Sequence, residues 1–135
     1  MSGLTIFQIV GSAMHAQSTR LNTVASNMAN GDAVSGDPNT VYKAREPLFQ
    51  AVAVGDNPAV QGVRVTQIKE STSEPIKRYE PGHPLADEQG YVYAPDIDPV
   101  AQMVNMISAS RSYQANVEML NTAKELAIAT LNIGR

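Results

Sequence analysis

The side chains best suited to catalysis or metal binding are few and far apart in this chain of 135 residues. The two histidines, His15 and His83, have no His or Cys partner at the spacing of a metal site. Asp96 and Asp98 resemble a fragment of an oxygen-ligand site, but no calcium-binding loop follows them. The serines of "SASRS", residues 108–112, have no base nearby in the sequence. We therefore expect no catalytic, metal or cofactor site, and no enzymatic activity.

Composition argues against several other functions. The net charge is −3, without the clustered Lys and Arg that nucleic-acid binding needs. There is no cysteine, which excludes a disulfide framework. No apolar run approaches the ~20 residues of a membrane-spanning helix. The first cationic residue is Arg20, so the N-terminus lacks the basic region of a cleaved signal peptide. We expect no direct membrane span, and export, if it occurs, without an ordinary cleaved leader.

An unusual group of amides lies in "LNTVASNMANGD", residues 21–32. Asparagine is a poor residue inside a helix, because its amide competes for nearby backbone groups. We expect Asn27 and Asn30 to satisfy carbonyls at a helix end and to bond across to adjacent chains. A frayed helix end is the simpler alternative.

These amides end a predicted amphipathic helix over residues 5–30. Its apolar side chains alternate spacings of three and four residues, interrupted only by Gln17, which is the period of a coiled-coil contact. Thr5 and Gln8 have capping-box spacing at its start, and Gly31 follows its end. The side chains that we predict to form an assembly interface are Phe7, Val10, Met14, Leu21, Val24 and Met28.

A second, longer helix is predicted for residues 99–133. Asp98 is a favoured N-cap residue, Pro99 suits the first helical position, and Gly134 suits the end. At 1.5 Å per residue this helix would be roughly 50 Å long. Its predicted interface is wide enough for more than one neighbour and consists of Met103, Met106, Ile107, Tyr113, Val117, Leu120 and Leu131.

The segment between the helices has the character of β structure. Strand-like pieces are "VYKAREPLFQAVAV", "GVRVTQIKE", "IKRYEP" and "GYVYAP". Val63 and Val65 alternate with polar residues, although Ile68 is out of phase with them. We predict an α+β fold: an N-terminal coiled-coil helix in residues 1–30, a β-rich hairpin or small sheet in 31–97, and a C-terminal helix in 98–135 that pairs with the first.

The predicted helix pair is only marginally stable by itself. Burial of the six apolar side chains of the first helix contributes roughly 10–15 kcal/mol at most. Fixing the backbone of its ~25 residues costs about 1–2 kcal/mol each, which helical hydrogen bonds offset in part. We therefore expect both helices to need neighbours from other chains, and to be mobile in the isolated subunit. A private pair, stable without partners, is the simpler alternative.

Two segments resemble signatures of the flagellar rod and hook protein family. The first, "GSAMHAQSTRLNTVASNMAN", contains an Ala-x-Asn-[Leu/Met]-Ala-Asn core. The second is "VNMISASRSYQANVEMLNTAKE", residues 104–125. The two occur in the family's order at opposite ends of the chain. The residues that carry the resemblance include Ala25, Asn27, Ala29, Asn30, Ser110, Tyr113, Asn116 and Asn121.

The resemblance implies a structural subunit of the bacterial flagellar basal body, in the proximal rod that carries torque from motor to hook. It implies terminal helices paired in an inner coiled-coil layer, with the β-rich middle facing outward. It also implies passage through the flagellar type III export apparatus without a cleaved leader, and assembly in the periplasm. The implied partners are other copies of the chain, the rod proteins FlgB, FlgF and FlgG, and the base protein FliE.

A rival hypothesis from a different class is a soluble helical binding module or export chaperone. Its helix pair would be folded and protease-resistant alone, whereas the helices of a rod subunit would be labile until assembled.

Overall fold

The computed structural model describes residues 3–135 and confirms an α+β fold. In chain order the elements are α1 (Gly3–Ala29), β1 (Arg45–Val54), β2 (Asn57–Glu70), β3 (Ile76–Tyr79), β4 (Tyr91–Ala94) and α2 (Pro99–Ile133). Every strand falls within, or overlaps, one of the segments predicted from the sequence.

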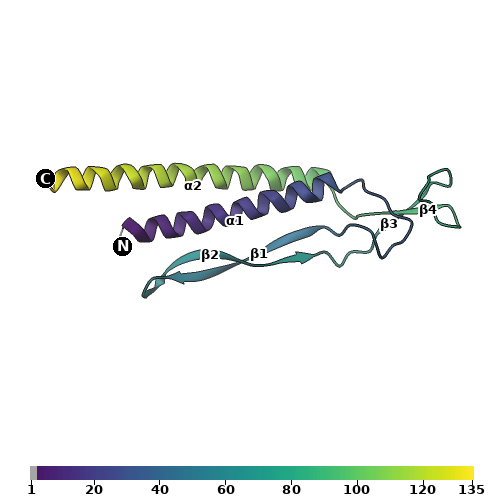
Figure 1. The fold of residues 1–135 in the computed structure, drawn as a ribbon, viewed down its shortest axis with the longest axis horizontal. Coiled ribbons are helices and arrows are strands. Elements are labelled where there is room, and N and C mark those ends of the chain that lie inside the picture. The colour runs from purple at the N-terminus through teal and green to yellow at the C-terminus, as the bar shows by residue number, and fades with distance from the viewer. Residues whose placement is uncertain (1–2) are drawn as a thin grey trace.

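The elements are arranged in layers around α1 (Figure 1). Helix α2 packs antiparallel along one side of α1, and the β1–β2 ribbon contacts α1 on another side. Strands β3 and β4 lie at the far end of the molecule, away from the start of α1 and the end of α2. The last turns of α2 extend past the described start of α1 (Figure 1). With α2 on one side and the β1–β2 ribbon on another, helix α1 has two neighbours within its own chain.

The ends of α2 follow the predicted chemistry. The Asp98 carboxylate accepts a hydrogen bond from the Val100 backbone nitrogen at 2.9 Å, and Pro99 is the first helical residue. The Gly134 backbone nitrogen donates to the Thr130 carbonyl at 3.2 Å. The predicted N-cap of the first helix is wrong: α1 already includes Gly3, so Thr5 lies inside the helix.

Strands β1 and β2 pair as a long antiparallel hairpin that turns at Gly55, whose φ of 73° favours glycine. The register shifts between Leu48 and Phe49, where β2 carries an extra residue. This bulge explains why Ile68 is out of phase in the sequence. Ile68 pairs with Pro47, and Val65 pairs with Phe49. Pro47 and Phe49 are two residues apart on β1, so the extra residue in β2 places Ile68 on the same face of the ribbon as Val65.

Strands β3 and β4 form a second, smaller antiparallel sheet. The Asp87 carboxylate closes the loop between them by accepting hydrogen bonds from the Gln89 and Tyr91 backbone nitrogens, both at 2.9 Å, and from the Tyr93 hydroxyl at 3.2 Å. The hydrogen bond from Tyr91 is the main reason that the pKa of Asp87 is lowered. Desolvation, followed by the Asp87 hydrogen bond and charge, raises the pKa of Tyr93.

The core is thin. Its fully buried apolar side chains are small: Val10, Ala16, Val24, Val41, Val92, Ala94 and Ala109. Many larger apolar side chains remain exposed, most of them on α2. Within residues 3–135, neither helix is long and apolar enough to cross a membrane.

Candidate assembly interface

The contact between α1 and α2 is polar at one end and apolar at the other. Near the C-terminal end of α1, Arg20 Nε donates to Asn105 Oδ1 at 2.6 Å. Near its N-terminal end, an open apolar groove runs between the helices. It is lined by Ile6, Ile9, Val10, Ala115, Glu118, Met119, Thr122, Ala123 and Leu126. Between these ends lie Ala16 and Ala109, which are 1% and 0% exposed.

Asn27 joins three parts of the fold and is 2% exposed. Its Nδ2 donates to the Arg45 carbonyl at 2.8 Å and to Gln102 Oε1 at 3.2 Å. Its Oδ1 accepts from the Arg45 backbone nitrogen at 2.8 Å and from the Tyr42 hydroxyl at 3.0 Å. Because one amide pairs with both backbone groups of Arg45, it replaces a strand partner at the start of β1 and fixes α1 to both the hairpin and α2.

This geometry corrects the expected role of Asn27. Its two donors and its oxygen are fully used within the chain, so no capacity remains for a bond to an adjacent chain. Asn30 Nδ2 donates to the Ser26 carbonyl at 2.8 Å, a carbonyl near the helix end that also accepts from the Asn30 backbone nitrogen at 3.1 Å. The expected bond from Asn30 to an adjacent chain stays a prediction. The Ser26 hydroxyl also lies 3.0 Å from the Tyr42 hydroxyl.

The hairpin contacts α1 through a face of small hydroxyl residues that sequence reasoning missed. Ser12 Oγ donates to the Ile9 carbonyl at 2.7 Å and accepts from the Val63 backbone nitrogen at 3.1 Å. Thr23 is 6% exposed and donates to the Thr19 carbonyl at 2.7 Å. Because these hydroxyls bond to the helix's own backbone, a polar face can be buried under the ribbon. Hydropathy alone gives no signal for this contact.

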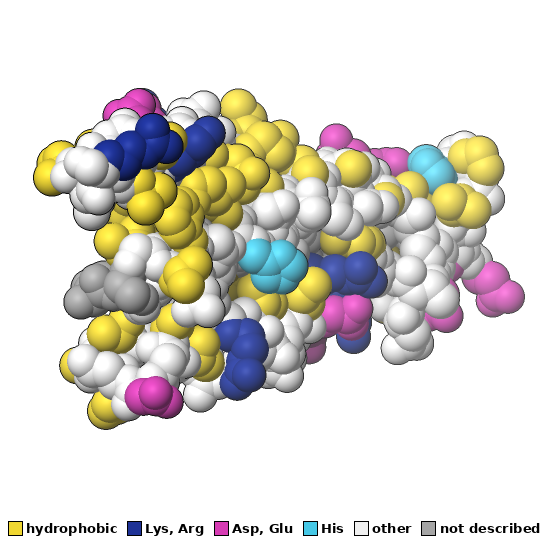
Figure 2. Space-filling view, turned by 60° about the vertical axis from the view of Figure 1, so that its left-hand side comes forward, with side chains coloured by type: hydrophobic (Ala, Val, Ile, Leu, Met, Phe, Trp, Pro, Cys, Tyr) yellow, Lys and Arg dark blue, Asp and Glu magenta, His cyan; other side chains and the backbone are white. Residues whose placement is uncertain are grey.

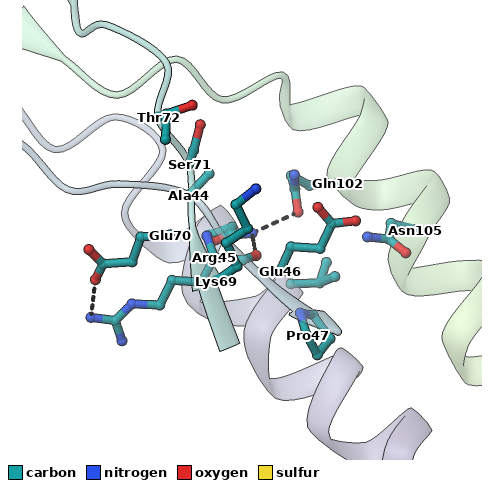
Figure 3. A pocket seen from close by; sticks show the side chains of 12 residues that line it. Ala44, Arg45, Glu46, Pro47, Lys69, Glu70, Ser71, Thr72, Gln102 and Asn105 are labelled. Carbon is teal, nitrogen blue, oxygen red and sulfur yellow. Dashed lines mark hydrogen bonds and ion pairs between the residues drawn. The ribbon is translucent and has the colours of Figure 1, made fainter. Parts of the chain in front are cut away.

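A polar hollow of about 380 Å³ lies where β1, β2 and α2 approach one another (Figure 3). Glu46 extends across it towards Gln102 and Asn105 on α2. On its rim, Arg45 forms an ion pair with Glu70 at 3.5 Å, and both side chains are about half exposed. Among the described residues no group of three or more His, Cys, Asp or Glu side chains could hold a metal ion.

The predicted interface residues divide into three groups by exposure. Val10 and Val24 are buried. The half-buried group is Phe7, Met14, Leu21, Met106, Tyr113, Val117 and Leu120. The exposed group is Met28, Met103, Ile107 and Leu131. Leu131 is 72% exposed because the last turns of α2 extend past the described start of α1 (Figure 1).

The motif residues other than Asn27 and Tyr113 have less defined roles. Ala25, Ala29 and Asn121 are exposed, whereas Asn30, Ser110 and Asn116 are half-buried. Asn116 Nδ2 donates to the Ser112 carbonyl of its own helix at 2.8 Å.

An apolar surface covers the end of the molecule where α2 ends. Figure 2 shows hydrophobic side chains gathered over the C-terminal part of α2 and the adjoining part of α1. The large exposed residues of this end are Leu4, Met119, Leu126, Ile128, Leu131 and Ile133. We call these six side chains the open-end patch. Exposed apolar side chains gathered at one end in this way are typical of a protein–protein contact region.

Two long paired helices and an exposed apolar end are features of a structural subunit that assembles with other chains. Comparison with known families identifies the class. Residues 7–36 match the family model "Flagella basal body rod protein", and residues 88–133 match "Flagellar basal body rod FlgEFG protein C-terminal".

Full-length relatives narrow the class further. The chain is 52% identical over 135 residues to the flagellar basal-body rod protein FlgC of Yersinia enterocolitica, with all of both chains covered. It is 50% identical over 135 residues to FlgC of Escherichia coli O157:H7, again covering both chains completely. It is 41% identical to FlgC of Buchnera aphidicola subsp. Acyrthosiphon pisum, over 98% of each chain. The chain therefore belongs to the FlgC family of flagellar basal-body rod proteins.

It is a structural component of the basal-body rod and not an enzyme. As a rod protein it assembles with other flagellar rod components.

Proposed function

We propose that this chain polymerises in the proximal rod through α1 and α2, and that the resulting rod carries torque from motor to hook. The observation that carries the proposal is the open-end patch, whose side chains are between 48% and 83% exposed in the described chain. Burial of such side chains against neighbouring helices is the main source of association free energy available to the subunit.

In the assembled rod the two helices pair as a coiled coil. Buried or half-buried positions recur every seven residues on each helix, which supports this pairing. On α1 these are Val10, Gln17 and Val24, and on α2 they are Met106, Tyr113, Leu120 and Ala127. Val10 and Val24 are buried and the others are half-buried. The 35 residues of α2 against the 27 of α1 leave the end of α2 for a neighbouring subunit.

Three segments have distinct roles in this proposal. Residues 1–30 and 98–135 form the inner helical layer, and residues 31–97 face outward.

The partners are other copies of the chain, FlgB, FlgF, FlgG, the base protein FliE and, during export, the flagellar type III apparatus. Full-length identity of about half to FlgC proteins disfavours the alternative of a binding module or export chaperone.

Hydrogen exchange on the purified monomer tests the proposal. We expect fast exchange in residues 3–29 and 99–133 relative to the β-rich middle, because the exposed patch leaves the helices dependent on neighbours. In basal bodies containing the chain, the same segments are expected to exchange slowly. Strong protection of both helices in the monomer, unchanged by assembly, would contradict the proposal and favour a self-sufficient helical module.

A substitution separates the patch from the rest of the fold. Leu131→Asp introduces a charge at an exposed position, so the isolated chain is expected to keep its stability. Incorporation into basal bodies is expected to fall at least tenfold, because the charge cannot be buried in an apolar contact. Asn132→Asp, at the next and also exposed position, is the matched control.

A further inference from the structure

A second exposed apolar surface lies in the first turns of α2, apart from the open-end patch. Its side chains have the spacing i, i+3, i+4 and i+7, which places them on one face of the helix. They are Val100, Met103, Val104 and Ile107, and they are 67%, 49%, 62% and 55% exposed. We call these four side chains the α2 stripe.

The α2 stripe faces away from α1. In the same turns Gln102 and Asn105 make the hydrogen bonds to α1, and at 3.6 residues per turn these two residues lie on the opposite side of the helix. The sequence from Pro99 to Ser110 contains no charged residue. An uncharged helix with apolar side chains at these four spacings is typical of a segment that docks into an apolar groove.

The groove between α1 and α2 near the open end has the dimensions to hold such a stripe. Its volume is about 590 Å³, and its wall on α2 extends from Ala115 to Leu126. At 1.5 Å per residue this wall is about 17 Å long, whereas the stripe is about 11 Å long. Glu118 is the one charged residue that lines the groove. The groove is therefore long enough, and apolar enough, for the four side chains of the stripe.

The stripe and the groove are different surfaces of one chain. A contact between them is heterologous, and repeating it produces a ring or an open helix of subunits. A two-fold dimer would instead bring each surface against itself. In a ring or helix whose axis runs along the helices, the α2 helices of neighbouring copies are parallel.

Parallel packing determines which residues meet. An offset of about 15 residues, or roughly 22 Å, places the whole stripe within the groove of the next copy, with Val104 beside Met119. The same offset brings Arg111 level with Leu126 of that copy and next to its Glu125. Arg111 and Glu125 are both exposed in the subunit and have opposite charges. Their attraction favours the same register as the apolar contact.

We propose that the α2 stripe of one copy docks into the groove between α1 and α2 of the next copy. The contact buries the stripe and part of the open-end patch together, and the Arg111–Glu125 pair lies at its edge. The inference rests on the proposed function and deepens it, because it names the partner of the helical interface. Each chain then supplies both halves of a repeating contact.

Engineered cysteines test the contact directly, because the chain contains no cysteine of its own. In Val104→Cys/Met119→Cys the two residues of one helix are about 22 Å apart, whereas a disulfide needs Cα atoms within about 7 Å. Oxidation of purified basal bodies with Cu²⁺–phenanthroline is therefore expected to link separate copies into a ladder of covalent dimers and longer chains. Mass spectrometry is expected to find residue 104 joined to residue 119.

Two controls accompany this variant. Ser108→Cys/Met119→Cys places the first cysteine at an exposed position beside the stripe, so it is expected to cross-link at least fivefold less. Val104→Cys alone is expected to give no covalent dimer. Dimers of this single variant would indicate a two-fold contact and overturn the proposal. Assembled basal bodies without the bond between residues 104 and 119 would also overturn it, and would leave the groove to a different rod protein.

A charge exchange tests the register without cysteines, and it decides the question if the double-cysteine variant does not assemble. In cells that lack their own copy of the protein, Arg111→Glu is expected to enter basal bodies about fivefold less than the unmodified chain. Arg111→Glu/Glu125→Arg is expected to restore incorporation to within about twofold. Neither residue has a charged neighbour three or four positions away on α2, so the isolated chain is expected to keep its stability. Equal incorporation of the single and double variants would overturn the proposal.

Leu131→Asp tests the proposed function separately. Normal assembly of this variant would refute the helical interface itself. If Leu131→Asp fails to assemble, but the bond between residues 104 and 119 and the rescue by charge exchange are both absent, only the contact between stripe and groove is refuted.

Discussion

Replacing Asn27 tests whether one amide holds the helices to the hairpin. Asn27→Ala removes four hydrogen bonds and leaves both backbone groups of Arg45 without their side-chain partner. The Tyr42 hydroxyl and the Gln102 amide can turn to other partners or to water, so the main loss is at Arg45. Unpaired buried groups of this kind cost about 1–3 kcal/mol each, and partial access of water reduces the total to about 2–4 kcal/mol.

The assay is thermal unfolding of the purified chain, followed by circular dichroism. For a chain of this size a loss of 1 kcal/mol lowers Tm by about 3–5 °C, so Asn27→Ala is expected to lower it by roughly 10 °C. Asn30→Ala is the control, since Asn30 is half-buried and its amide makes one bond, to the Ser26 carbonyl. Its expected loss is below about 1 kcal/mol. Equal Tm values for the two variants would refute the reasoning.

The isosteric change Asn27→Asp adds a test by pH. The new carboxylate keeps the acceptor for Tyr42 and for the Arg45 backbone nitrogen, but it faces the Arg45 carbonyl and Gln102 Oε1 without a proton to donate. Burial and these oxygens raise its pKa in the folded state above the unfolded value. The folded state then binds the proton more tightly, so the variant is expected to gain stability as pH falls from 7 to 5. A flat profile, parallel to that of the unmodified chain, would contradict this.

Two further predictions concern the hairpin and the small sheet. In Gly62→Ala the new Cβ would lie 2.8 Å from Ser12 Oγ, so we expect the ribbon to be displaced from α1 and Tm to fall. Gly82→Ala is the control, because nothing lies within 4 Å of its new Cβ. Equal Tm values for the two variants would contradict the close contact between the ribbon and α1. The pKa of Asp87 is lowered in the fold, so its contribution to loop stability is present above the unfolded pKa of about 3.8 and is lost as pH falls through the lower folded value. We expect protection of the Tyr91 amide to fall in that acid range, as measured by hydrogen exchange corrected for intrinsic rates. If the Tyr91 amide stays equally protected below that pH range, the role of the Asp87 carboxylate is refuted.

The secondary structure of this protein follows largely from local sequence signals. Asp98, Pro99 and Gly134 locate the ends of α2, because capping and the fixed φ of proline act on the residues next to them. Short β-branched runs separated by turns likewise locate the strands. The signatures in α1 and α2 identify the family, and the full-length relatives confirm it.

Only the tertiary structure decided which side chains meet. The hydropathy of α1 predicts one apolar stripe, but the helix has two neighbours in its own chain, and the face under the ribbon consists of hydroxyl residues. A bulge in β2 decides the phase of Ile68. The partners of Asn27 lie 15 to 75 residues away in the chain. Such contacts depend on how complete elements pack, and an amide that pairs equally well with any donor and acceptor carries no sequence signal of its partner.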